Sequence, residues 1–189
     1  MKKLRLAGLA LAAVLSMQFT YAQNEPMKEK TVEVGGAPMY PSKNIVENAV
    51  NSADHTTLVA AVKAAGLVET LQSDGPFTVF APTNAAFAKL PAGTVETLLK
   101  PENKAMLASI LTYHVVSGKL DAKTIEAKIK EGKGKVELTT VAGGKLWVMK
   151  KDGKFWLKDE KGGMASVTIG DVYQRNGVIH VIDSVVLPK

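Results

Sequence analysis

The chain has 189 residues, a length that suits one domain, and it is 46% hydrophobic and 22% charged. This composition excludes an intrinsically disordered chain, which would be more charged and less apolar. The formal net charge is +6 and the sequence contains no cysteine, so thiol catalysis and a disulfide-stapled scaffold are both excluded.

Residues 1–22 have the form of a cleavable secretion signal. They open with three basic residues, continue with an apolar run over residues 6–15, and end in the small-x-small site Thr20-Tyr21-Ala22. The alternative is an uncleaved N-terminal anchor, but the apolar run is short for a membrane span. We therefore expect a signal peptide that is removed, and a mature protein that is periplasmic or secreted.

Removal of the signal changes the charge of the protein. It takes away three basic residues and no acidic ones, which leaves 21 basic and 18 acidic residues and a net charge of +3. Nucleic-acid-binding domains usually carry a strong basic stripe. The small charge and the predicted export therefore argue against a nucleic-acid partner, and no later apolar segment is long enough for membrane insertion.

The stretch 23–41 mixes charges, Pro and Gly with little periodicity. It is expected to be an exposed lead-in, with a short strand at Thr31–Val34 as the alternative. The folded domain is expected over residues 42–189.

Helical spacing of apolar residues begins near residue 42 and recurs up to Gly132. Asp54 and Asp121 are expected N-caps, Thr83 is expected to cap a short helix, and Gly66 stands where a helix C-terminal glycine belongs. The remaining helices are expected over residues 67–71, 95–99 and 101–114. In the last of these, Met106, Leu107, Ile110, Leu111 and His114 share one face.

Strand patterns dominate the second half of the chain. One early strand, Phe77–Phe80, lies among the helices, and five more are expected over residues 136–141, 145–149, 155–158, 166–169 and 178–186. Glycine pairs and Asp-Gly or Asn-Gly turns separate them, as tight hairpins require. Helices first and strands later predict an α+β fold rather than a parallel sheet of βαβ units.

Motifs of known chemistry are missing from the sequence. There is no Gly-x-Ser-x-Gly elbow, no phosphate-binding loop, no twelve-residue calcium loop and no zinc-protease motif. Gly132-Lys133-Gly134 lacks the rest of a dinucleotide fingerprint and is interpreted as a loop. We expect no catalytic residues, no cofactor and no metal; the alternative is a metal site formed by the three scattered histidines.

Each histidine has a structural interpretation. His114 lies on an apolar helix face, which predicts a core residue with one ring nitrogen bonded to the backbone; contact with a partner is the alternative. His180 alternates with apolar residues in a strand and is expected to be structural. His55, at a helix start, is expected to be exposed and incidental.

Lysines are concentrated in residues 119–161, which contain 12 lysines and 7 acidic residues. One interpretation is an electrostatic patch for an anionic polysaccharide or a cell surface, formed by Lys150, Lys151, Lys154 and Trp156. The favoured alternative is a solvated hairpin whose lysines discourage edge-to-edge pairing. Trp147, Phe155 and Trp156 are expected either to pack the sheet as cross-strand neighbours or to form a contact surface beside the lysines.

Three separated stretches resemble the fasciclin-like domain family. They are the run from Gly75 to Phe87 that ends at Leu90-Pro91, the run from Tyr113 to Gly118, and the run from Asn176 to Asp183 that ends at residues 185–188. Their order and spacing fit the family over residues 42–189.

The resemblance implies helices packed on a β-wedge of mainly antiparallel strands and a module for adhesion or matrix interaction without a catalytic centre. In animal members the Tyr-His pair, here Tyr113 and His114, is linked to integrin binding, whereas the signal and single domain of this chain look bacterial. Asp183, near the end of the last predicted strand, is expected to bond a backbone group or a partner in the first motif. Asp183→Ala is therefore expected to destabilise the domain.

The leading functional hypothesis is an exported, non-enzymatic module that binds a protein or an anionic polysaccharide at the envelope or in the extracellular matrix. Two alternatives are a binder of a small molecule or pigment, and a hydrolase of an envelope polymer. Because one domain binds weakly, either a multivalent partner or weak homo-oligomerisation is expected.

Overall fold

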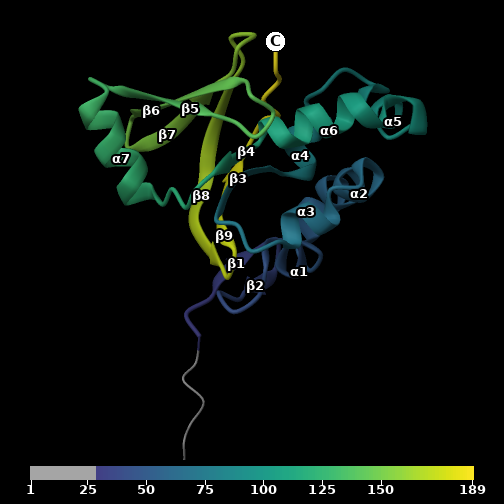
Figure 1. Ribbon diagram of the computed structural model, residues 1–189, viewed down its shortest axis with the longest axis horizontal. Coiled ribbons are helices and arrows are strands. Elements are labelled where there is room, and N and C mark those ends of the chain that lie inside the picture. Colours follow the sequence, from purple (N-terminus) through teal and green to yellow (C-terminus); the bar gives the residue numbers. More distant parts are fainter. Residues whose placement is uncertain (1–28) are drawn as a thin grey trace, which may run out of the picture.

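The computed structural model describes residues 29–189 (Figure 1). The predicted signal peptide, residues 1–22, lies outside the described residues. Within residues 29–189, no helix is both long enough and apolar enough to cross a membrane.

A seven-stranded sheet forms the centre of the molecule (Figure 1). Its strand order is β4-β3-β9-β8-β7-β6-β5, and every neighbouring pair is antiparallel except the parallel pair β3–β9. The strands are β3 (Phe77–Pro82), β4 (Val115–Ser117), β5 (Lys135–Thr139), β6 (Lys145–Lys151), β7 (Lys154–Lys158), β8 (Met164–Gln174) and β9 (Gly177–Ile182).

Helices occupy most of the first half of the chain, as the sequence predicts. The α-helices are α1 (Ile45–Ala49), α2 (Thr56–Ala65), α3 (Val68–Gln72), α4 (Asn84–Ala88), α5 (Thr94–Leu98), α6 (Lys104–Tyr113) and α7 (Ala122–Glu131). Two short 3-10 turns, η1 (Ala53–His55) and η2 (Pro101–Asn103), lead into α2 and α6. The predicted α+β class is confirmed.

Most of the predicted helix ends are confirmed. Thr83 accepts a hydrogen bond from the Ala86 N–H, and Asp121 accepts one from the Thr124 N–H. Gly66 ends α2 in the left-handed region with φ +73°, where a residue without Cβ is unstrained.

The expected cap at Asp54 is wrong. Asp54 lies inside η1, and the N–H of Thr57 in the first turn of α2 instead donates to the Asn84 side-chain oxygen at 3.0 Å. The capping group thus comes from α4, a contact that local sequence cannot predict.

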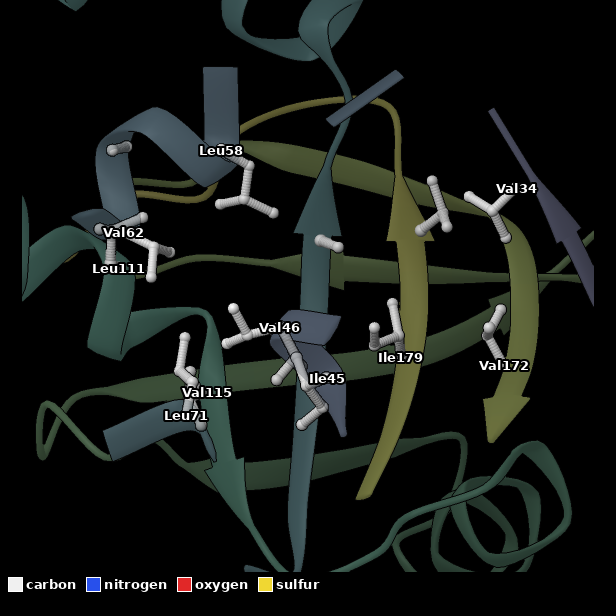
Figure 2. Close-up of a cluster of buried hydrophobic side chains, with 14 of the residues drawn as sticks. Val34, Ile45, Val46, Leu58, Val62, Leu71, Leu111, Val115, Val172 and Ile179 are labelled. Carbon is white, nitrogen blue, oxygen red and sulfur yellow. The ribbon is translucent and has the colours of Figure 1, made fainter. Parts of the chain in front are cut away.

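Two hydrophobic cores lie along the sheet. The first packs α1, α2, α3 and α6 against β3 and β9 (Figure 2). Figure 2 shows Ile45 and Val46 beside Ile179 in this core, with Val172 on the far side of Ile179. The second core packs α7 and the end of α6 against β5, β6 and β7. Met106, which the helical spacing placed on the apolar face of α6, is instead 59% exposed.

The predicted exposed lead-in is wrong where the structure describes it. Strands β1 (Val32–Val34) and β2 (Ala37–Met39) form an antiparallel hairpin. Val34 and Met39 are 4% and 3% exposed and belong to the first core; Figure 2 shows Val34 at its edge. The alternative of a short strand at Thr31–Val34 is thus confirmed over Val32–Val34. Burial of the two apolar side chains stabilises the hairpin, so the packed domain begins before residue 42.

Candidate functional site

Tyr113, at the end of α6, is fully buried. Its hydroxyl donates to the Lys145 carbonyl at 2.5 Å and accepts from the Glu160 N–H at 3.2 Å. Burial raises the pKa of Tyr113 to about 12. The phenol therefore ties α6 to β6 and to the turn after β7, and it offers no surface to a partner.

His114 caps the same helix and is 2% exposed. Its Nε2 lies 3.2 Å from the backbone N of Val186 and accepts that N–H, so the ring proton is on Nδ1, which donates to the Ile110 carbonyl at 2.8 Å. Burial lowers the pKa of His114 to about 4, so the imidazole is neutral at physiological pH. The prediction of a core histidine with a backbone bond is confirmed.

The other two histidines are also buried. His180 contacts the Leu120 carbonyl through Nε2 at 2.8 Å and stacks on the Phe80 ring with centroids 5.7 Å apart. The expectation that His55 is exposed is wrong, because it is 3% exposed and its Nδ1 lies 2.8 Å from the Ser52 hydroxyl. Its Nε2 is buried without a hydrogen-bond partner, and burial lowers the pKa of this ring.

The histidines do not form a metal site in the part of the chain that the structure describes. No group of three His, Cys, Asp or Glu side chains within residues 29–189 is placed to hold a metal ion. The alternative of histidines converging in space thus has no geometry to support it.

The lysine-rich hairpin β6–β7 presents its lysines on two opposite faces. Lys150 points to the side of α7, where it meets Glu126 at 3.0 Å and lies 5.8 Å from the centre of the Phe155 ring. This contact lowers the pKa of the Glu126 carboxyl. Lys151 and Lys154 are direct cross-strand partners on the opposite side. The predicted set of Lys150, Lys151, Lys154 and Trp156 is therefore not one patch, because adjacent strand residues alternate between faces.

One face of strands β5 to β8 carries both tryptophans of the chain. The register of the three antiparallel pairs fixes its members, which we call the outer face: Lys135, Glu137, Thr139, Lys145, Trp147, Met149, Lys151, Lys154, Trp156, Lys158, Met164 and Ser166. Met149 lies directly opposite Trp156, and Lys158 directly opposite Trp147. Trp147 and Trp156 are thus diagonal neighbours, within reach of each other for aromatic side chains.

The opposite side of these strands is covered. Leu146, Val148 and Leu157 alternate with the outer-face residues and are completely buried against α7. Figure 1 shows α7 beside these strands, while the other helices gather beyond β3 and β9. Within residues 29–189, no helix packs on the outer face.

The two indoles differ in their hydrogen bonds. Trp147 donates from Nε1 to the Glu137 carboxylate at 3.0 Å, and Lys145 meets the same carboxylate at 2.9 Å. These contacts lower the pKa of Glu137, chiefly through Lys145. The Nε1 of Trp156 is buried without a partner, so the part of its ring that half-burial leaves accessible is hydrocarbon.

Comparison with known proteins identifies the fold. The protein-family model that describes the fasciclin domain matches residues 53–188 of this sequence. This protein belongs to the fasciclin-domain family.

Two relatives and one solved structure illustrate the range of this fasciclin family. Protein sll1483 of Synechocystis is 49% identical over 181 residues, which cover 96% of this chain and 89% of that protein. The immunogenic protein MPB70 of Mycobacterium bovis is 39% identical over 145 residues, which cover 74% of this chain and 66% of that protein. The FAS1 domain pair of the insect cell adhesion molecule Fasciclin I superposes with a TM-score of 0.68 at 19% identity, covering 84% of this chain and 58% of that one.

The three stretches that carry the fasciclin resemblance meet in space. They contribute β3, β4 and β9, which are adjacent in the sheet with β3 in the centre. The Tyr113–His114 pair lies immediately before β4; Tyr113 belongs to the second core and His114 is buried next to it in the chain. In this fasciclin domain the family motifs therefore build the scaffold, while the outer face lies at the other end of the sheet.

Sequence reasoning missed part of the outer face. Lys135, Met149, Lys158 and Met164 were not singled out, although the alternation of Lys145, Trp147, Met149 and Lys151 along β6 is visible in the sequence. The pairing register that joins them to β5, β7 and β8 comes only from the structure.

Two hollows lie elsewhere in this fasciclin domain. An apolar cavity of about 80 Å³ lies within the first core and reaches His55. It is well below the roughly 300 Å³ at which pockets for drug-sized ligands begin. A groove of about 310 Å³ lies between α4, α5, α6 and the C-terminal segment, lined mainly by apolar side chains that include Leu98, Met106 and Leu187.

Proposed function

We propose that this protein is an exported, non-enzymatic adhesion module that binds a protein or polysaccharide of the cell envelope or extracellular matrix. Membership of the fasciclin family supports the proposal, and one structural neighbour is a domain pair from a cell adhesion molecule. The signal-like residues 1–22 support export.

The outer face is the observation that carries this proposal. An aromatic sheet face that no helix covers within residues 29–189, edged by charge, is typical of an interaction surface rather than of a core. By contrast, Tyr113 and His114 are buried and their polar atoms are engaged with backbone groups. We therefore assign binding to the outer face and a structural role to the Tyr-His pair.

Binding of the purified protein to the envelope fraction of its source tests this function. The expected result is saturable retention, which weakens when outer-face residues are substituted and persists in Tyr113→Phe, because that variant removes only a buried hydroxyl. A protein that is not retained by envelope or matrix material would contradict the proposal. N-terminal sequencing of the protein recovered outside the cytoplasm should begin at Gln23.

A second candidate function is binding of a small apolar molecule. The groove between α5, α6 and the C-terminal segment favours it, because its volume of about 310 Å³ reaches the lower end of ordinary ligand pockets. Native mass spectrometry of the protein from its source should then show an added mass that a Leu98→Lys variant lacks.

A further inference from the structure

We propose that the outer face binds acidic polysaccharide chains that lie along strands β6 and β7. This inference rests on the proposed adhesion function and names its partner class. It is argued from the arrangement of aromatic, apolar and cationic side chains on this one face.

The apolar centre of the face is bracketed by lysines on both strands. Along β6 the order is Lys145, Trp147, Met149, Lys151. Along β7, in the same spatial direction, it is Lys158, Trp156, Lys154. Each end of the face therefore carries a pair of lysines, with the two indoles and Met149 between them.

The two lysine pairs are separated by the length of the strand. From Lys145 to Lys151 the backbone advances about 20 Å at the usual rise of a β-strand. A single small anion can reach only one end, whereas an extended polymer with repeated negative charges reaches both.

The positive charge of the face is largely uncompensated. Five of its residues are lysines and one, Glu137, is acidic and already paired with Lys145. The other four lysines are exposed and form no ion pair within residues 29–189: Lys135, Lys151, Lys154 and Lys158. This charge is complementary to carboxylate or sulfate groups and selects against neutral polymers.

The aromatic centre favours a sugar ring over other anions. The electron-rich face of an indole attracts the polarised C–H groups of a pyranose ring. Both indoles are held by the sheet, and the accessible part of Trp156 is hydrocarbon because its N–H is buried. A ligand that combines C–H faces with regularly spaced charges, such as a polyuronate, matches both features.

An anionic membrane is a poorer match. Interfacial binding requires apolar side chains that insert some 5–10 Å into the lipid headgroup region. Both tryptophans are half-buried within the side-chain layer of the sheet, which leaves them unable to insert. A vesicle-binding experiment therefore distinguishes an anionic membrane from an acidic polysaccharide as the partner of the outer face.

Tryptophan fluorescence provides a direct test, because the two tryptophans of the chain, Trp147 and Trp156, both lie on this face. The probe is sodium alginate, as a polymer and as oligomers of defined length, with dextran as the neutral control. Alginate is expected to protect both indoles from acrylamide quenching at low salt, and protection should be lost in 0.5 M salt because charge pairing is screened. Oligomers much shorter than about 20 Å should bind more weakly, because they reach only one lysine pair.

A matched pair of variants identifies the surface. The outer variant Lys151→Gln/Lys154→Gln/Lys158→Gln should bind alginate about tenfold more weakly. The control variant Lys63→Gln/Lys123→Gln/Lys128→Gln loses the same charge from exposed helical positions and should bind within twofold of the parent. Trp147→Thr, which keeps a good strand former, should weaken binding without changing its salt dependence.

Several results would overturn the inference. They are equal losses in the two lysine variants, alginate binding that leaves tryptophan quenching unchanged, equal protection by dextran, or protection by phosphatidylglycerol vesicles and not by alginate. If alginate fails to bind while the envelope fraction still retains the protein, the adhesion function stands and only the polysaccharide assignment fails.

Discussion

His114 Nε2 accepts a hydrogen bond from the backbone N–H of Val186, a residue 72 positions further along the chain. The bond joins the end of α6 to the segment after β9, and it requires an imidazole without a proton on Nε2. Protonation of this nitrogen would set two donors against each other inside the core.

The first prediction is a loss of stability in acid that depends on His114. Burial is the main cause that lowers its pKa to about 4 in the folded protein from 6.5, so the unfolded chain binds the proton first. The contribution of the neutral ring to the free energy of unfolding is therefore complete above pH 6.5 and decreases as the pH drops toward 4. Below both pKa values the total loss is about 3 kcal/mol. Burial lowers the pKa values of His55 and His180 as well, and these add in the same direction.

Urea unfolding between pH 7.5 and pH 4 measures this dependence. The parent protein should lose stability across this range, whereas His114→Gln should be less stable at pH 7.5 and have a shallower pH slope. An unchanged slope in the variant would exclude His114 as the titrating group.

The second prediction concerns Asp183, whose carboxylate accepts hydrogen bonds from the Ser166 N–H and hydroxyl, each at 2.8 Å. Partial burial alone would raise its pKa, but the Ser166 bonds and Lys89 together lower it. Asp183→Ala should cost about 2 kcal/mol, because two charge-assisted bonds are lost.

Lys89→Ala is the matched control for Asp183. The Lys89–Asp183 pair is 3.8 Å long and partly exposed, so its removal should change stability by less than about 0.5 kcal/mol. Equal melting temperatures for Asp183→Ala and the parent would refute the structural role of this carboxylate.

The third prediction concerns Asn176, which is 3% exposed. Its side chain accepts from the Ile45 N–H at 3.0 Å and donates to the Leu71 and Ser73 carbonyls at 2.8 Å each. Asn176→Ala leaves these groups buried without partners and should cost about 3 kcal/mol or more. Asn51→Ala removes one exposed side-chain bond and should cost less than about 1 kcal/mol by the same measurement; similar losses in the two variants would contradict the network.

The fourth prediction compares two glycines, Gly177 and Gly153, whose positions require glycine for different reasons. A Cβ on Gly177 would lie 2.1 Å from the Phe77 carbonyl oxygen in the parallel pair β3–β9, whereas a Cβ on Gly153 meets nothing and is disfavoured only by φ +76°. Gly177→Ala should therefore lower the melting temperature much more than Gly153→Ala, which should cost about 1 kcal/mol. Comparable melting temperatures would show that the backbones can move apart.

Much of the fold follows from local patterns. The caps at Thr83 and Asp121 and the glycine end at Gly66 depend on groups within a few residues, so the sequence predicts them. Strand β8 runs from Met164 to Gln174 and is longer than the strand predicted over residues 166–169. Register shifts near Ile169 and a positive φ at Asp171 let it continue along β9. Such irregularities depend on the neighbouring strand.

What the sequence did not reveal depends on contacts between distant residues. His55 is buried beside side chains of the first core. Strand β4 forms because Val115 and Val116 pair with Val79 and Thr78 of β3. The alternation of side chains along a strand was enough to assign Lys150 and Lys151 to opposite faces of the sheet from the sequence alone. The outer face as a whole required the register of four strands.

The parallel pairing of β3 with β9 joins segments that begin at Phe77 and at Gly177. Until the last strand has left the ribosome, β3 has a neighbour on one side only, and the first core lacks Ile179 and Val181. Sheets closed by such distant pairings fold late and slowly. Under the proposed export of this chain, the position of β9 delays folding until synthesis is nearly complete, which gives a translocation machinery time to engage an unfolded polypeptide.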